Sequence, residues 1–265
     1  MGDFGTSLLI GLAAALGAIG GNFFKELLPT LAIEDWKLKR QLVAVFHKYR
    51  DPLILAATEL VHRLDEIEDE FPPRFLTMTV KAAARPHVPV QVTTEDPYFQ
   101  HYKLESSVYR LCAFLGWLEL FRQDIVFLDS GKRTLNRQVD SALKLIRAAL
   151  ADGHLNEAPD WEEWRDALIF REEQRAIGEQ MIVERGGDRV VMGYGAFCDR
   201  YRQPSGCDWF AVADRFLLDL LDKRDFRRFR LRLLTRGLID LIEFLDPSRV
   251  SDRLMSIKAR VANVA

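Results

Sequence analysis

Apolar residues recur at helical spacing along most of this chain. Asp35 can cap one helix, whose apolar positions continue to Phe46, and Asp51 precedes a second helix with Pro52 at its first position. The same spacing predicts further helices at about 97–128, 132–151, 161–184, 209–222 and 224–245, with a short last helix from residue 251. The helix at 97–128 is apolar on almost every side, so we expect it at the centre of the core. The pattern as a whole predicts an all-α protein, folded as a multi-helix bundle.

Two stretches interrupt the helical pattern. Residues 71–97 contain several prolines and alternating valines, which exclude a long helix and favour an extended excursion or a loop with one short strand. After a turn at Gly186-Gly187, the string VVMGYGAFCDRY is ambiguous, because its start favours a strand and its end a helix. No repeat or linker divides the chain after residue 30, so we expect one domain, 31–265, behind an N-terminal segment, 1–30.

The N-terminal segment contains an uncharged and largely apolar stretch, residues 4–24. As a helix it would be about 32 Å long, close to the ~30 Å hydrocarbon core of a bilayer. A secretory signal peptide would need basic residues before this stretch, and only Asp3 precedes it. Positive charges follow from Lys25 onward, so the segment is predicted to be a single-pass transmembrane helix, with the main domain in the cytoplasm.

Small residues in this stretch follow a regular spacing. Ala13, Gly17 and Gly21 lie four residues apart, and Gly11 belongs to a similar row on a neighbouring face. Such spacing lets helices approach closely in lipid, where packing drives their association. It therefore predicts a homo-oligomer in the bilayer. The same segment is also compatible with a plain anchor, or with a helix buried in a soluble protein.

Charge and composition narrow the expected partners. The chain has 37 Lys and Arg against 39 Asp and Glu, a net charge of -2, whereas a dedicated nucleic-acid binder is normally basic. Its three cysteines are unclustered, which is typical of free thiols in a reducing compartment. The histidines are scattered, and no P-loop or dinucleotide fingerprint occurs. We therefore predict no metal and no cofactor, and we do not expect nucleic acid as a partner.

The string FREEQRAIGEQM carries one candidate polar site. Glu172, Arg175 and Glu179 lie near one face of a predicted helix, at spacings of three and four residues. Two carboxylates around a guanidinium can form a pocket that binds phosphate, orients a partner helix or supports catalysis. The alternative is an ion-pair network within the helix, which Gly178 would allow to pack closely against a neighbour.

A second candidate is a basic stripe on the predicted helix at 224–245. Its members recur every four residues: Arg224, Arg228, Arg232 and Arg236. A basic amphipathic helix can contact anionic lipid or an acidic protein. The alternative is a stripe balanced within the fold, for which the acidic run at 65–70 supplies partners.

Several strings resemble an uncharacterised family of helical proteins from bacteria and some eukaryotes. They are KYRDPLILAATEL, YRLCAFLGWLELFRQDIVFLD, FREEQRAIGEQM, GYGAF and GLIDLIEFLD, and they span roughly residues 45–247. The resemblance implies that this helical region is a recurring unit. It implies no catalytic residues, because no activity is established for that family.

These observations favour a membrane-anchored, self-associating helical scaffold or interaction protein without catalytic activity. One alternative is a membrane-perturbing, pore-forming effector of a stress or defence pathway. Another is an enzyme whose pocket is built around Glu172, Arg175 and Glu179. The expected partners are the lipid bilayer, further copies of the chain, and an acidic protein or anionic lipid.

Overall fold

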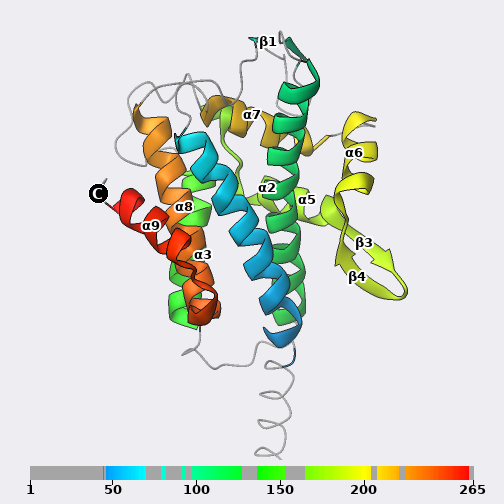
Figure 1. Ribbon diagram of the computed structural model, residues 1–265. Helices are drawn as coiled ribbons and strands as arrows, with labels where there is room; N and C mark the ends of the chain where they lie inside the picture. Colours follow the sequence, from blue (N-terminus) through cyan, green and yellow to red (C-terminus); the bar gives the residue numbers. More distant parts are fainter. Residues whose placement is uncertain are drawn as a thin grey trace, which may run out of the picture.

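The computed structural model describes residues 44, 46–69, 79–81, 91–93, 97–126, 136–152, 165–203, 208–220 and 225–262. Helices account for most of this part of the chain: residues 46–69, α2 Pro97–Val126, α3 Asn136–Ala151, η2 Arg165–Ala167, α5 Arg171–Met181, α6 Tyr194–Arg202, α7 Phe210–Leu220, α8 Asp225–Leu245, η3 Pro247–Arg249 and α9 Asp252–Ala262. Two antiparallel hairpins complete it: β1 Thr79–Lys81 with β2 Gln91–Thr93, and β3 Ile182–Arg185 with β4 Asp188–Val191. The described part is therefore a mainly helical bundle, as predicted, with two small hairpins added (Figure 1).

Helix α2 is the central element of the bundle. It packs against α5, α7 and the base of β4, while α3 packs along α8, and α9 lies against α8 (Figure 1). Leu111, Phe114 and Leu115 of α2 are buried on one side of its axis, and Leu120 is buried on the opposite side. Burying each of these large side chains contributes roughly 1.5–3 kcal/mol, so α2 anchors the core as its all-round apolar sequence predicted.

Glycines set the closest approaches between helices. A Cβ added at Gly178 of α5 would lie 2.7 Å from the Glu119 Cβ and 2.8 Å from the Leu115 carbonyl oxygen of α2. A Cβ at Gly237 of α8 would lie 2.9 Å from a side-chain carbon of Ile146 in α3. The prediction that Gly178 permits close helix packing is therefore confirmed, and its partner is α2.

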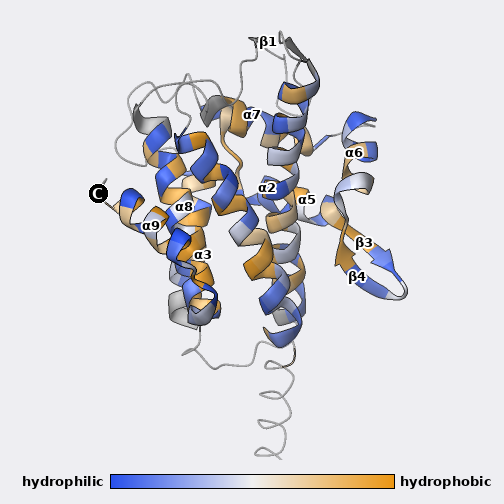
Figure 2. Cartoon of the chain, viewed as in Figure 1, coloured by the Kyte–Doolittle hydropathy of each residue, from blue (hydrophilic) through white to orange (hydrophobic). Residues whose placement is uncertain are grey.

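The predicted helix at 161–184 was wrong at both ends: residues 165–167 form η2, residues 168–170 are not helical, and α5 begins only at Arg171. Helix α5 ends at Met181, and residues 182–185 form β3, which pairs with β4. The β-branched Ile182 and Val183 favour a strand, and Gly186 and Gly187 have φ values of 63° and 87°, which suit a tight hairpin turn. The hairpin is hydrophobic at its base and hydrophilic at its tip (Figure 2).

Two other boundaries differ from the prediction. The helix of residues 46–69 runs through Pro52 and does not begin there. Proline removes one backbone hydrogen bond from a helix interior, but Tyr49 and Leu53 are fully buried on either side and hold the helix in place. In the proline-rich stretch the structure describes two short strands, β1 and β2, where one was expected.

The N-terminal predictions lie outside the described residues. This applies to the segment 1–30, with its apolar stretch and the small residues Gly11, Ala13, Gly17 and Gly21. Within the part of the chain that the structure describes, no helix has the length and apolar character needed to cross a bilayer.

Candidate functional site

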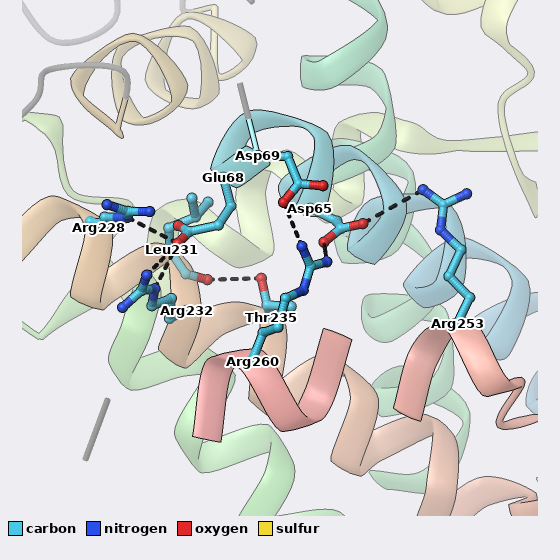
Figure 3. A network of polar contacts seen from close by, with 9 residues as sticks. All are labelled: Asp65, Glu68, Asp69, Arg228, Leu231, Arg232, Thr235, Arg253 and Arg260. Carbon is cyan, nitrogen blue, oxygen red and sulfur yellow. Dashed lines mark hydrogen bonds and ion pairs between the residues drawn. The ribbon is translucent and has the colours of Figure 1, made fainter. Parts of the chain in front are cut away.

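The basic stripe on α8 lies against the acidic end of the 46–69 helix. Arg228 Nε donates to Glu68 Oε1 at 2.9 Å, and Arg232 Nε donates to the same oxygen at 2.7 Å (Figure 3). Arg236 pairs weakly with Asp240 of its own helix, at 3.9 Å, and Arg224 is outside the described residues. The alternative in which the acidic run balances the stripe therefore holds for Arg228 and Arg232.

Helix α9 contributes two further arginines to this network of ion pairs. Arg260 donates to Asp65 and Asp69, and Arg253 Nη2 lies 3.5 Å from Asp65 Oδ2 (Figure 3). A pocket of about 410 Å³ lies between these helices. Because three carboxylates and three arginines line it and pair with one another, the network ties helices together and offers little net charge to a ligand.

The predicted polar site on α5 does not form from its three named members. Glu172, Arg175 and Glu179 are all exposed, and within the described residues no ion pair joins them. The prediction of an ion-pair network among these three residues was therefore wrong. The catalytic pocket also lacks support, because the pocket that Arg175 lines contains neither Glu172 nor Glu179.

Arg175 instead belongs to a cluster of arginines from three helices. The pocket has a volume of about 90 Å³ and lies where α2, α3 and α5 meet. We call it the arginine site, and define it by its charged lining residues: Glu119 and Arg122 from α2, Arg147 from α3, and Arg171 and Arg175 from α5.

The one carboxylate of the arginine site is already engaged. Glu119 is 3% exposed, and it accepts from Arg122 Nε at 2.7 Å, from Arg122 Nη2 at 2.5 Å and from Gln123 Nε2 at 2.7 Å. Among the described residues, no carboxylate lies within ion-pair distance of Arg147, Arg171 or Arg175. Three guanidiniums therefore share one pocket without a matching negative charge.

The electrostatics of Arg147 reflect this excess of positive charge. Arg147 is half-buried, and burial together with the neighbouring Arg175 and Arg171 lowers the pKa of its guanidinium. On α5, Arg171 and Arg175 are four residues apart, a spacing at which like charges repel each other by roughly 0.2–0.5 kcal/mol. An arrangement that destabilises its own charges in a pocket is typical of a functional site.

The fold holds these arginines in place through neighbouring residues. The close approach at Gly178 brings α5 against α2 near Glu119, one turn beyond Arg175. Gln174, which is buried, donates through its side-chain amide to the Ile169 carbonyl at 2.9 Å and fixes the start of α5. The Glu173 carboxylate accepts from the Phe170 backbone N–H at 2.8 Å and caps the helix.

Sequence reasoning found Arg175 and Gly178 but missed Arg122, Arg147 and Arg171. The three missed arginines lie on α2, α3 and α5, and only the packing of these helices brings them together. One local signal was available, since Arg171 and Arg175 share a helix face without an acidic residue between them on that face.

A second pocket lies between the N-terminal half of α2 and α6. It has a volume of about 530 Å³, and four of its lining residues are tyrosines: Tyr98, Tyr102, Tyr194 and Tyr201. Its polar centre is Glu105, which accepts from Tyr194 Oη at 2.8 Å, Cys198 Sγ at 2.8 Å and Arg202 Nε at 2.9 Å. Burial opposes ionisation, but these three donors lower the pKa of Glu105. The carboxylate is thus occupied by residues of the fold.

The cysteines of the described part show no sign of reactivity. Cys112 is fully buried in α2, and burial raises the pKa of its thiol. Burial and the nearby Glu105 likewise raise the pKa of Cys198, which disfavours the thiolate. Cys207 lies outside the described residues. Within those residues, no three His, Cys, Asp or Glu side chains are grouped so as to hold a metal ion.

Comparisons with known proteins do not assign a function to the arginine site. The chain matches no model of a known protein family, no curated protein and no solved structure at a significant level. The resemblance to an uncharacterised helical family stays a prediction.

Proposed function

We propose that this protein is a non-catalytic receptor for a phosphate-type anion, which binds at the arginine site. A self-associating membrane anchor at the N-terminus carries the receptor domain. The anchor rests on the sequence of residues 4–24, and the receptor rests on one observation: Arg147, Arg171 and Arg175 surround one pocket without a carboxylate partner among the described residues.

The chemistry of the arginine site supports binding rather than catalysis. A guanidinium stays charged at neutral pH and donates through a planar fork that matches phosphate oxygens. It is therefore a good binder of phosphate but a poor acid or base. The carboxylate of Glu119, which a hydrolytic mechanism would need as a base, is held by Arg122 and Gln123.

The proposal predicts that the full-length chain, kept in detergent, binds pyrophosphate with one ligand per chain. Arg147→Gln and Arg175→Gln should each weaken binding about tenfold or more, since a charge-assisted hydrogen bond contributes roughly 1.5–3 kcal/mol. Isothermal titration calorimetry at low ionic strength measures both the affinity and the stoichiometry.

Arg185→Gln provides the matched control. Arg185 is exposed at the end of β3 and does not line the arginine site, so this change removes the same charge elsewhere. Equal loss of binding in the control and in the two site variants would contradict the proposal, as would unchanged binding in the site variants.

A further inference from the structure

We infer that the arginine site selects a terminal, dianionic phosphoryl group, that is, a phosphomonoester whose organic part stays outside the pocket. This inference rests on the proposed function and specifies its ligand. It is carried by the charge balance of the site, by the size of its pocket and by the directions from which its donors come.

The charge balance favours a ligand with two negative charges. Four arginines and one glutamate line the pocket, and Glu119 is used by Arg122, so Arg147, Arg171 and Arg175 carry three positive charges that no ion pair among the described residues balances. A phosphodiester has one negative charge and would leave two of these three unmatched. A phosphomonoester carries close to two negative charges at pH 7, which fits the excess better.

The volume of the pocket admits the phosphoryl group and little else. The pocket has a volume of about 90 Å³. Sites that enclose a whole drug-sized ligand have volumes of about 300–1,000 Å³. The sugar, base or peptide attached to the phosphate would therefore remain in solvent.

The three unpaired arginines differ in depth. Arg147 is half-buried on α3, whereas Arg171 and Arg175 are exposed on α5. A terminal phosphoryl group presents three oxygens, and guanidiniums on two different helices can donate to them from different sides. A phosphate inside a diester presents two free oxygens, and its two ester arms would both have to leave the same small pocket.

The ligand's own titration gives this inference a specific signature. The second ionisation of a phosphomonoester has a pKa of about 6. No histidine lines the pocket, and its charged lining residues are Glu119 and the four arginines. Two further carboxylates interact electrostatically with these arginines: Asp140 of α3 with Arg147, and Glu179 of α5 with Arg122. A loss of binding between pH 7.5 and pH 5.5 would therefore follow the charge of the ligand.

The test compares two small esters on the full-length chain. At pH 7.5, methyl phosphate should bind at least tenfold more tightly than dimethyl phosphate, and this preference should shrink about threefold or more at pH 5.5. Arg147→Gln should remove the preference, Arg147→Lys should restore part of it, and Arg185→Gln should keep it whole. Circular dichroism confirms that each variant is folded.

Two further probes distinguish the source of the phosphoryl group. Phosphoserine should bind about as tightly as methyl phosphate, because its organic part stays outside the pocket. If inorganic phosphate binds and phosphoserine does not, the site takes the free ion and the inference is wrong. If dimethyl phosphate binds as tightly as methyl phosphate, the inference fails while the anion receptor stands. If none of these probes nor pyrophosphate binds, both fail.

Discussion

At the scale of single residues, the carboxyl group of Asp214 in α7 has a pKa far above the ordinary value of an aspartate. Its carboxyl group is buried and accepts from Tyr201 Oη at 2.6 Å. Burial raises its pKa to about 7, although the hydrogen bond from Tyr201 works in the opposite direction. Near neutral pH this carboxyl therefore lies close to its titration midpoint, next to a tyrosine that lines the pocket between α2 and α6.

This shift predicts a pH-dependent stability that one substitution removes. The folded pKa of Asp214 lies above its unfolded value of 3.8, so the folded state binds more protons, and stability falls as the pH rises from about 4 to about 7. Each pH unit in this window costs at most ~1.4 kcal/mol, and the loss levels off roughly one unit above the folded pKa of about 7. The free energy of unfolding of Asp214→Asn relative to the wild type should therefore rise across the window. Urea unfolding at pH 4.5, 6 and 7.5 measures it, and a constant difference would contradict the assignment.

The sequence alone does not identify Asp214 as a buried carboxyl group. The first turns of α7 are buried over consecutive positions, Phe210 to Asp214, so helical spacing does not separate an inner face from an outer one there. The same limit applies to the arginine site, where Arg147 and Arg175 are 28 positions apart in the sequence and meet only through helix packing. Residues that share one helix face are predictable, whereas residues that meet across helices are not.

At the scale of elements, the contact between α2 and α5 links the fold to the arginine site. Gly178→Ala would place a Cβ 2.7 Å from the Glu119 Cβ, so α5 must move away from α2. Overpacking of this kind typically costs 1–3 kcal/mol. The substitution should lower the free energy of unfolding by about that amount, and it should weaken pyrophosphate binding, because Arg171 and Arg175 move with α5.

Gly195→Ala is the matched control for this prediction. An added Cβ at Gly195 of α6 would meet no atom within 4 Å, and alanine favours a helix over glycine by up to ~1 kcal/mol. The control should therefore leave binding unchanged and keep or raise stability in thermal unfolding. If Gly178→Ala binds and unfolds like the control, the close contact does not position the arginines.

Most helices were predictable because their apolar residues recur over long stretches that no proline interrupts. Helices α2, α3, α7 and α8 begin and end within a few residues of the predicted bounds. The end of α5 was missed because residues 182–185 are compatible with a helix until their pairing with β4 is known. Pro52 was taken as a helix start because the burial of Tyr49 and Leu53, which sustains the helix through it, is a property of the whole bundle.

At the scale of the whole molecule, the proposed anchor and receptor would reinforce each other. Copies associated through residues 4–24 would present several arginine sites on one side of the bilayer. A ligand that carries many phosphomonoesters would then bind several sites at once, and its second contact becomes intramolecular. The gain in avidity requires no change in the affinity of a single site.

This arrangement predicts that association and single-site binding can be separated. Gly17→Leu combined with Gly21→Leu fills the small-residue row, so crosslinking in lipid vesicles should give monomers. Methyl phosphate should bind this variant as it binds the wild type, whereas a surface dense in phosphoserine should retain the wild type at least tenfold longer. Ile19→Phe adds volume on the opposite face of the helix, and it should keep both the oligomer and the avidity. Oligomers that persist in the glycine variant would show that the row does not drive association. Release of the wild type from membranes by carbonate would exclude the span itself, and the receptor would then have to act without an anchor.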